Sequence, residues 1–270
     1  MSLHLTNQPI GVFDSGVGGI SVLQHIHALL PHENLIYFAD SKYAPYGNKT
    51  QDEIIARCMH IADFLLQKQV KCLVVACNTA TAAAIDTLRD TFDVPIIGME
   101  PAIKPAAEAS KNGIIGVLAT VGTLKSAQFA ALLESYGRNV KVVTQACVGL
   151  VECIERGELD TPATKALIRQ YTAPLLAEGA DTIVLGCTHY PFVKQVIQAI
   201  VGQDFNQKHI AMIDTGAAVA KQLQRQLDQT GLLSTNNQIA NVQFWTNSNA
   251  ENAAQVTKML WGTDTEVEFL

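Results

Sequence analysis

Apolar stretches typical of buried strands alternate with stretches of helical period along the whole chain. The strand-like stretches are rich in Val, Ile and Leu and end at small or polar residues. Because they are apolar along their full length and helices separate them, the pattern predicts parallel sheets that helices cover on both faces. The predicted strands span residues 10–14, 35–40, 72–77, 94–98, 114–120, 140–146, 182–187, 210–214 and 242–246.

The clearest helical pattern lies at 51–68. Ile54, Cys58, Ile61 and Leu65 recur at the spacing of one helix face, and acidic residues occupy the first turn. Tight hairpin turns are scarce, which disfavours a β-sandwich.

Two segments about a hundred residues apart resemble each other: LVVACNTAT at 73–81 and IVLGCTHYP at 183–191. Each is an apolar strand that stops at a cysteine, Cys77 or Cys187, just before a predicted helix start. A thiol in that position lies where the thiolate form is favoured. The sequence therefore predicts a pair of acid/base groups that face one substrate.

A second pair of segments repeats at nearly the same offset, because Gly11 of IGVFDSG corresponds to Gly116 of IIGVLATVG. Two such pairs predict two homologous half-sized units. The predicted fold is α/β: two similar three-layer lobes with mainly parallel sheets, related by pseudo-two-fold symmetry, with the active site in the cleft between the lobes. We assign 1–97 and 210–270 to the first lobe and 98–209 to the second.

Composition narrows the class of protein. The chain of 270 residues is 48% hydrophobic and 16% charged, as in a compact globular protein. Its net charge of −6 argues against nucleic acid as a partner. We expect no membrane association and a cytoplasmic location, because the first residues lack a secretory signal pattern and no apolar run is long enough to cross a bilayer.

In a reducing compartment the six cysteines are expected to be free thiols. No CxxC pair occurs and the histidines show no zinc-like spacing, so we expect no metal. Cys58, Cys72 and Cys147 fit buried core positions. Cys77 and Cys187 differ from them because each ends a strand and is followed by polar residues.

The segment GVFDSGVGG at 11–19 is a strand followed by a glycine-rich turn into a helix. Such a turn offers backbone N–H groups to an anion, either a phosphate or a carboxylate. It is not GxGxxG and it lacks the lysine of a P-loop. Asp14 would repel a phosphate and suits an ammonium group or a proton relay better.

The segment ADSKYAPYGNKT at 39–50 follows a strand and contains Pro45, Tyr46 and Gly47 in a turn. It fits an ordinary surface loop and a binding loop equally well.

Two further residues are candidates by position. His189, two residues after Cys187, either polarises the thiol or is an ordinary loop histidine. Glu152, in GLVECIE, lies at a predicted helix start, where a solvated glutamate is the default expectation.

Two thiols that face one carbon restrict the chemistry. A nucleophilic hydrolase leaves the second cysteine unexplained, and a dithiol redox site usually has a CxxC pair. Deprotonation on one face of the carbon and protonation on the other uses both thiols and inverts the centre. Because the α-proton of an amino acid is very weakly acidic, the site must stabilise a carbanion by electrostatics and exclusion of water.

The motifs GVFDSGVGG, PYG, ACNTATA, LVE and GCTHYP, in this order, resemble those of the cofactor-independent glutamate racemases of the aspartate/glutamate racemase superfamily. The resemblance runs from about residue 10 to the final strand. It implies an isomerase that interconverts L- and D-glutamate without pyridoxal phosphate or another cofactor and supplies D-glutamate for peptidoglycan. It also implies motion between the lobes and a homodimer.

The resemblance further implies a role for each matching residue. Cys77 would take the proton from D-glutamate, and Cys187 would take it from L-glutamate. Asp14 and His189 would relay protons to the adjacent thiols, and Glu152 would assist near Cys187. The substrate-binding residues would be Asp14, Ser15, Pro45, Tyr46, Gly47, Asn78, Thr79, Thr120 and Thr188.

Two alternatives stay open at this point. Another two-cysteine isomerase, such as an aspartate racemase or a maleate isomerase-like enzyme, would share the site plan, because one methylene changes discrimination by only about 1–3 kcal/mol. A non-enzymatic anion-binding α/β protein would use the glycine turn and would tolerate replacement of either cysteine.

Overall fold

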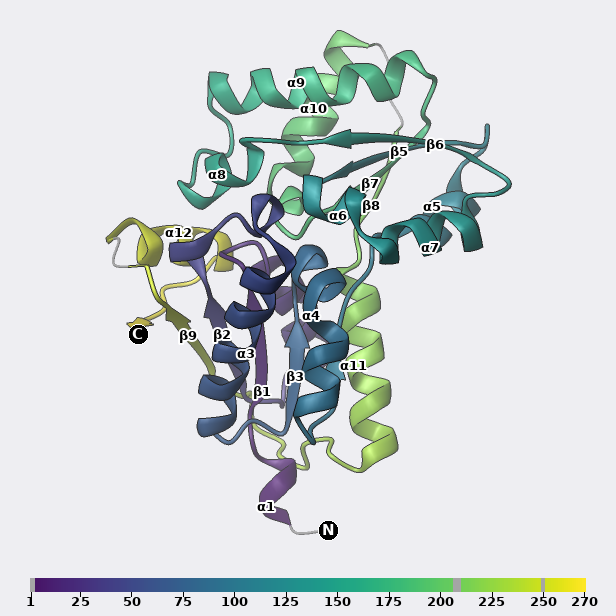
Figure 1. Ribbon diagram of the computed structural model, residues 1–270. Helices are drawn as coiled ribbons and strands as arrows, with labels where there is room; N and C mark the ends of the chain where they lie inside the picture. The colour runs from purple at the N-terminus through teal and green to yellow at the C-terminus, as the bar shows by residue number, and fades with distance from the viewer. Residues whose placement is uncertain (1–2, 206–209, 249–250) are drawn as a thin grey trace.

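Two parallel sheets form the frame of the computed structural model, which describes residues 3–205, 210–248 and 251–270 (Figure 1). Within these residues the first sheet has six strands in the order β10-β9-β2-β1-β3-β4, and the second has four in the order β6-β5-β7-β8. The strands are β1 (Ile10–Asp14), β2 (Leu35–Ala39), β3 (Cys72–Val75), β4 (Ile96–Ile97), β5 (Ile114–Ala119), β6 (Lys141–Ala146), β7 (Thr182–Gly186), β8 (Ala211–Ile213), β9 (Val242–Thr246) and β10 (Val267–Phe269).

Helices cover both faces of the first sheet. One buried cluster packs α2, α11 and α12 on one face, and a second packs α3 and α4 on the other. This lobe contains α1 (Leu3–Thr6), α2 (Ile20–Leu29), η1 (Ser41–Tyr43), η2 (Tyr46–Asn48), α3 (Gln51–Gln67), α4 (Asn78–Thr91), α11 (Gly216–Thr230) and α12 (Glu251–Trp261).

The second sheet is covered in the same way. Helices α8, α9 and α10 lie on one face and helices α5 and α7 on the other (Figure 1). Their apolar side chains form the buried clusters on the two faces. This lobe contains α5 (Ile103–Ala109), α6 (Val121–Lys125), α7 (Ala127–Tyr136), α8 (Leu150–Glu155), α9 (Pro162–Ala177), η3 (Tyr190–Val193) and α10 (Lys194–Asp204). The predicted fold class, two α/β lobes with parallel sheets, is confirmed.

Helix α3 shows why the sequence folds as it does locally. Thr50 and Glu53 form a capping box that satisfies free N–H groups at its first turn. Ile54, Ile61 and Leu65 then place one apolar stripe on the first sheet. The helix predicted at 51–68 is found at Gln51–Gln67.

The two lobes repeat one strand order. If the first four strands of each lobe are numbered along the chain, their order across the sheet is 2-1-3-4. This order is β2-β1-β3-β4 in the first lobe and β6-β5-β7-β8 in the second. The registers match as well, because Gly11 pairs with Leu73 and Gly116 pairs with Ile183. Each partner lies four residues before a cysteine, Cys77 or Cys187, so the two thiols occupy equivalent positions at the carboxyl ends of β3 and β7.

Two details differ from the sequence prediction. Strand β8 pairs with β7, so Ala211–Ile213 belongs to the second sheet, whereas the predicted boundary put residues 210–270 in the first lobe. Strand β10 was not predicted because Val267–Phe269 is a short, largely exposed edge strand without an apolar run. The division into 1–97 with the C-terminal segment and 98–209 otherwise stays a prediction.

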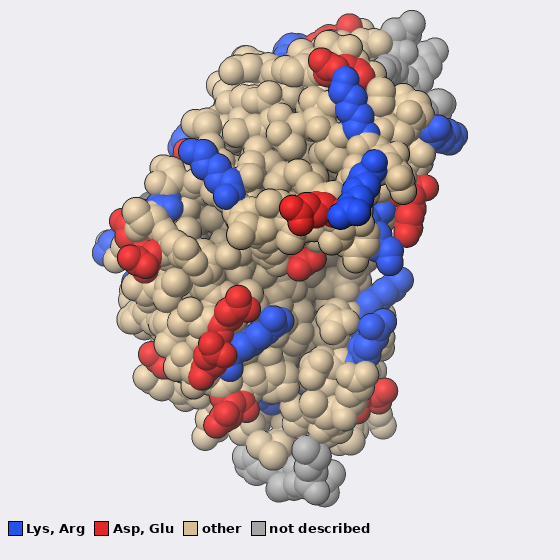
Figure 2. All heavy atoms as spheres, turned by 45° about the vertical axis from the view of Figure 1, so that its right-hand side comes forward, with Lys and Arg blue, Asp and Glu red and all other residues tan. Residues whose placement is uncertain are grey.

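The surface carries charges of both signs side by side. Figure 2 shows Lys and Arg next to Asp and Glu over one face. Ion pairs on the surface of the protein include Lys141 with Glu178 and Arg169 with Asp204. In the part of the chain that the structure describes, no helix is long and apolar enough to cross a bilayer.

Candidate active site

The two strand-end cysteines line one cavity between the lobes. Cys77 and Cys187 are only 5% and 7% exposed, and the cavity between them is narrow. Its lining joins both lobes: Ser15, Pro45, Tyr46, Gly47, Cys77, Asn78, Thr79, Thr120, Val151, Cys187, Thr188 and His189. All predicted site residues except Asp14 and Glu152 are therefore in its wall.

Cys77 caps helix α4 with its sulfur. The backbone N–H of Ala80 points at Sγ from 3.4 Å, and the Ser15 hydroxyl lies 3.7 Å away. Burial and the nearby charge of Asp14 nevertheless raise the pKa of Cys77 well above its ordinary value. Cys77 is therefore a thiol, and so a proton donor, in the resting site.

Asp14 lies fully buried behind Cys77. Its carboxylate accepts the N–H of Gly19 at 2.7 Å, the hydroxyl of Ser15 at 3.2 Å and, from the opposite lobe, the hydroxyl of Thr188 at 3.3 Å. Burial raises the pKa of Asp14, although the charge of His189 and a hydrogen bond from Cys77 oppose the rise. A carboxyl group tuned in this way can exchange a proton with the neighbouring thiol.

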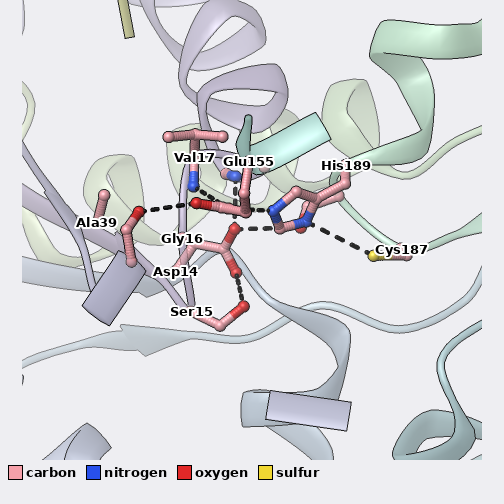
Figure 3. Close-up of polar contacts among 12 residues, drawn as sticks. Asp14, Ser15, Gly16, Val17, Ala39, Glu155, Cys187 and His189 are labelled. Atoms are coloured by element: carbon pink, nitrogen blue, oxygen red, sulfur yellow. Dashed lines mark hydrogen bonds and ion pairs between the residues drawn. The ribbon is translucent and has the colours of Figure 1, made fainter. Parts of the chain in front are cut away.

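The Cys187 side has a different partner. His189 Nδ1 lies 3.7 Å from Sγ of Cys187, and Nε2 lies 2.5 Å from a carboxylate oxygen of Glu155 (Figure 3). Burial disfavours the imidazolium, but hydrogen bonds to Cys187 and Glu155 outweigh it and raise the pKa of His189 well above its ordinary value. A cation therefore lies against the sulfur and stabilises negative charge on it.

Glu155, and not Glu152, is the carboxylate that contacts His189. Glu152 instead lines an adjoining pocket with Cys147 and Val148. The carboxylate expected beside His189 is thus Glu155 in the structure, and the catalytic role of Glu152 stays a prediction. The two residues lie one helical turn apart on α8, so GLVECIE contained both, and sequence spacing alone did not choose between them.

The glycine turn after β1 holds two protein carboxylates. Val17 N–H donates to Glu155 at 2.7 Å, and the N–H of Gly19 donates to Asp14. The anion anticipated from the sequence is thus supplied within the described chain. A β-carbon at Gly16 would overlap the Glu155 carboxylate, and one at Gly18 would overlap the His189 ring, so both positions require glycine.

The segment with Pro45, Tyr46 and Gly47 lines the cavity and is held from behind. Asp40 is fully buried and accepts the Tyr46 hydroxyl at 2.5 Å and two N–H groups of Arg57 at 2.7 and 3.0 Å. This network fixes the turn against α3. Of the two readings open from the sequence, the structure shows a loop that forms part of the cavity wall.

The cavity also contains polar groups that fit a small polar ligand. The Asn78 side chain is buried, yet neither its amide nitrogen nor its oxygen has a hydrogen-bond partner. Across the lobes, the hydroxyls of Thr79, Thr120 and Thr123 lie 2.8 to 3.1 Å from one another. An unpaired buried amide at such a wall is satisfied when a ligand supplies a carboxylate or an ammonium group.

Comparisons with known proteins give a consistent picture. The Asp/Glu/Hydantoin racemase family model matches residues 10–223. A glutamate racemase of Ectopseudomonas mendocina is 51% identical over 98% of this chain and 99% of its own length, and one of Pseudomonas aeruginosa PAO1 is 52% identical over 96% of each. The motif resemblance seen in the sequence is confirmed.

Solved structures agree with this. A glutamate racemase isoform of Bacillus anthracis superposes with a TM-score of 0.86 at 32% identity, covering 98% of both chains. A Francisella tularensis glutamate racemase in complex with D-glutamate superposes with a TM-score of 0.83 at 29% identity, covering 98% of both chains. A Picrophilus torridus aspartate racemase reaches 0.52 at 19% identity over 83% of this chain and 94% of its own, which shows a shared fold alone.

Proposed function

The chain belongs to the Asp/Glu/Hydantoin racemase family, and we propose that it interconverts L- and D-glutamate with two cysteines and supplies D-glutamate for peptidoglycan. One observation carries the proposal: Cys77 and Cys187 end equivalent strands, β3 and β7, and face one cavity with different acid/base partners. Such a pair serves the two faces of one carbon.

In the direction from L- to D-glutamate, the sulfur of Cys187 removes the α-proton, and the thiol of Cys77 delivers a proton to the opposite face. The imidazolium of His189 stabilises the negative charge on Cys187 before the transfer. Cys77 is poised as the donor, since burial and Asp14 keep it protonated.

In the reverse direction the roles exchange. Asp14 takes the proton from Cys77, and the pair of His189 and Glu155 returns one to Cys187, so that each sulfur regains the state it needs. We assign proton relay to Asp14, His189 and Glu155, with Glu155 replacing Glu152 in that role.

The wall between the cysteines would bind the substrate. The free amide of Asn78 and the hydroxyls of Ser15, Thr79 and Thr188 suit the α-carboxylate and ammonium groups. The tight enclosure excludes water, which strengthens these contacts as the carbanion forms. Pro45, Tyr46, Gly47 and Thr120 complete the wall.

Glutamate is favoured over aspartate as the substrate. The relatives at about half identity are named glutamate racemases, whereas the aspartate racemase in the structural comparison shares the fold at 19% identity. Cavity shape alone discriminates weakly, because one methylene contributes only about 1–3 kcal/mol.

The test is incubation with L-glutamate and then D-glutamate in D₂O, without added cofactor, followed by circular dichroism and by α-deuteration in NMR. We expect loss of optical activity from both enantiomers with incorporation of α-deuterium. Activity with aspartate or maleate but not glutamate would support the second isomerase class. Inactivity with all three would contradict the enzyme assignment.

We further propose that the enzyme acts in the cytoplasm as a homodimer. All six cysteines are free thiols, which suits a reducing compartment, and the motif resemblance supports the dimer. Sedimentation equilibrium would give twice the chain mass of 29.1 kDa, and a mass of one chain would contradict it.

A further inference from the structure

Ser41 of the first lobe contacts a carboxylate of the second lobe. It begins η1, directly after β2 in the first lobe, and its hydroxyl donates to Glu155 Oε2 at 2.9 Å. Glu155 belongs to α8 of the second lobe. Its other oxygen, Oε1, accepts the N–H of Val17 and contacts His189 (Figure 3).

The contacts of Glu155 form one chain of side chains that ends at sulfur. Ser41 holds Oε2, Val17 and His189 share Oε1, and His189 Nδ1 faces Cys187. The Glu155 side chain is only 14% exposed, so little water can replace a lost donor. Without the Ser41 hydroxyl, Oε2 loses this donor and only the contacts of Oε1 orient the carboxylate, which loosens its hold on the ring.

The position of Ser41 has no equivalent donor in the second lobe. Asp14 pairs with Ala39 in the first sheet, and the equivalent pair in the second is Ala119 with Ala146. Two residues beyond each lie Ser41 and Val148. Val148 is 64% exposed and has no hydroxyl, so this position of the second lobe supplies no donor that corresponds to Ser41. The hydroxyl that reaches Asp14 from the second lobe belongs instead to Thr188, next to Cys187.

We propose that Ser41 is a positioning residue for the Cys187 half of the reaction, which it supports from the opposite lobe through Glu155 and His189. The inference rests on the proposed racemase function. The inference predicts that loss of the Ser41 hydroxyl slows the proton transfers to and from Cys187 more than those to and from Cys77.

The test compares Ser41→Ala with Ser41→Thr, which keeps the hydroxyl. Loss of a hydrogen bond to a charged group lowers turnover by about tenfold or more, and Ser41→Thr restores most of it. Because L- and D-glutamate are equal in free energy, kcat/KM falls equally in both directions, so turnover alone does not identify the affected cysteine.

Primary isotope effects on kcat/KM identify it. With α-deuterated L-glutamate, the effect rises in Ser41→Ala because proton abstraction by Cys187 becomes more rate-limiting. With α-deuterated D-glutamate, the effect falls because reprotonation by Cys187 now limits the rate after abstraction by Cys77. A general structural defect would leave the two effects in their wild-type ratio.

The outcomes separate the two proposals. If the wild type does not racemise glutamate, the proposed function fails. If it does, but Ser41→Ala has wild-type turnover or an unchanged ratio of isotope effects, the inference about Ser41 is wrong. Ser41 is half-buried, and thermal melting of both variants checks the fold. If Ser41→Ala does not fold, Ser41→Cys, a weaker donor of similar size, takes its place with the same expected change in isotope effects.

Discussion

Gly18 lies so close to His189 that a β-carbon at position 18 would overlap the imidazole ring. His189 in turn contacts both Cys187 and Glu155. The absence of a side chain at Gly18 in the first lobe thus leaves room for the ring of the second lobe. This relationship gives the first prediction.

Gly18→Ala is expected to lower kcat by about tenfold or more, because a shift of the ring disturbs an aligned proton transfer. Gly202→Ala on α10 is the matched control, since no atom lies within 4 Å of its added β-carbon. The control keeps wild-type turnover and gains up to about 1 kcal/mol in helix stability. Circular dichroism measures the turnover of the two variants, and urea unfolding measures their stability. Equal activity of Gly18→Ala and Gly202→Ala would contradict the prediction.

Replacement of either cavity cysteine by serine is expected to abolish racemisation, with turnover lower by about 10³-fold or more. In D₂O, α-exchange of L-glutamate suffers more in Cys187→Ser, and exchange of D-glutamate suffers more in Cys77→Ser. Cys72→Ala is the control: burial raises the pKa of Cys72 to about 12, and it lies in the core away from the cavity. If both variants lost exchange equally for both enantiomers, the assignment of each thiol to one face of the α-carbon would be wrong.

Glu155→Gln and Glu152→Gln form a matched pair one helical turn apart on α8. We expect Glu155→Gln to lose about 10–100-fold in turnover, because His189 loses its charged partner. Glu152→Gln is expected to stay close to wild type. The reverse order of activities would restore Glu152 as the relay residue.

Asp14→Asn is expected to lose activity yet gain stability. Burial raises the pKa of Asp14, so the folded protein binds this proton more tightly than the unfolded chain, and the ionised carboxylate destabilises the fold. Below the ordinary value of 3.8 the carboxyl is protonated in both states and the variant has no advantage. As the pH rises through the raised folded value, the advantage grows to about 1 kcal/mol.

Urea unfolding of the wild type and Asp14→Asn between pH 3 and pH 8, about the range over which carboxyl and imidazole groups titrate, measures this difference. An advantage that is largest at low pH would have the wrong sign and would contradict burial as the cause of the shift.

A buried ion pair far from the cavity gives a prediction about stability alone. Lys71 and Glu33 are both almost fully buried, and Nζ of Lys71 lies 2.5 Å from Oε2 of Glu33. Lys71→Met leaves the Glu33 carboxylate unpaired and should lower the free energy of unfolding by about 3–5 kcal/mol. At low temperature the folded fraction keeps its kcat. The double variant Lys71→Met, Glu33→Gln should recover part of the loss in urea unfolding.

The strand pattern predicted most of the frame, because parallel strands buried on both faces are apolar along their full length. The offset between Cys77 and Cys187 predicted the repeat as well. The sequence did not predict the edge strand β10, because this strand is too short and too exposed to show an apolar pattern. The sequence also did not predict which lobe contains β8, because its pairing with β7 depends on the path of the chain between the two strands.

The site was predictable where chemistry lies next to a strand end and not where it crosses between lobes. Asn78, Thr79, Thr188 and His189 adjoin the cysteines in sequence and line the cavity as expected. Glu155 reaches Val17 and Ser41, which are more than a hundred residues away in sequence. Such contacts depend on how the lobes meet, which periodicity and spacing do not encode.

The equivalent placement of Cys77 and Cys187 bears on how a chiral molecule treats mirror-image substrates alike. A chain of L-amino acids has no mirror plane to offer to two enantiomers. Because both lobes repeat one strand order, each brings the same kind of group, a thiol at a strand end, to the shared cavity. Repetition of one half-fold thus lets an asymmetric chain present like groups to mirror-image substrates, and the unequal neighbours Asp14 and His189 show where the two halves differ.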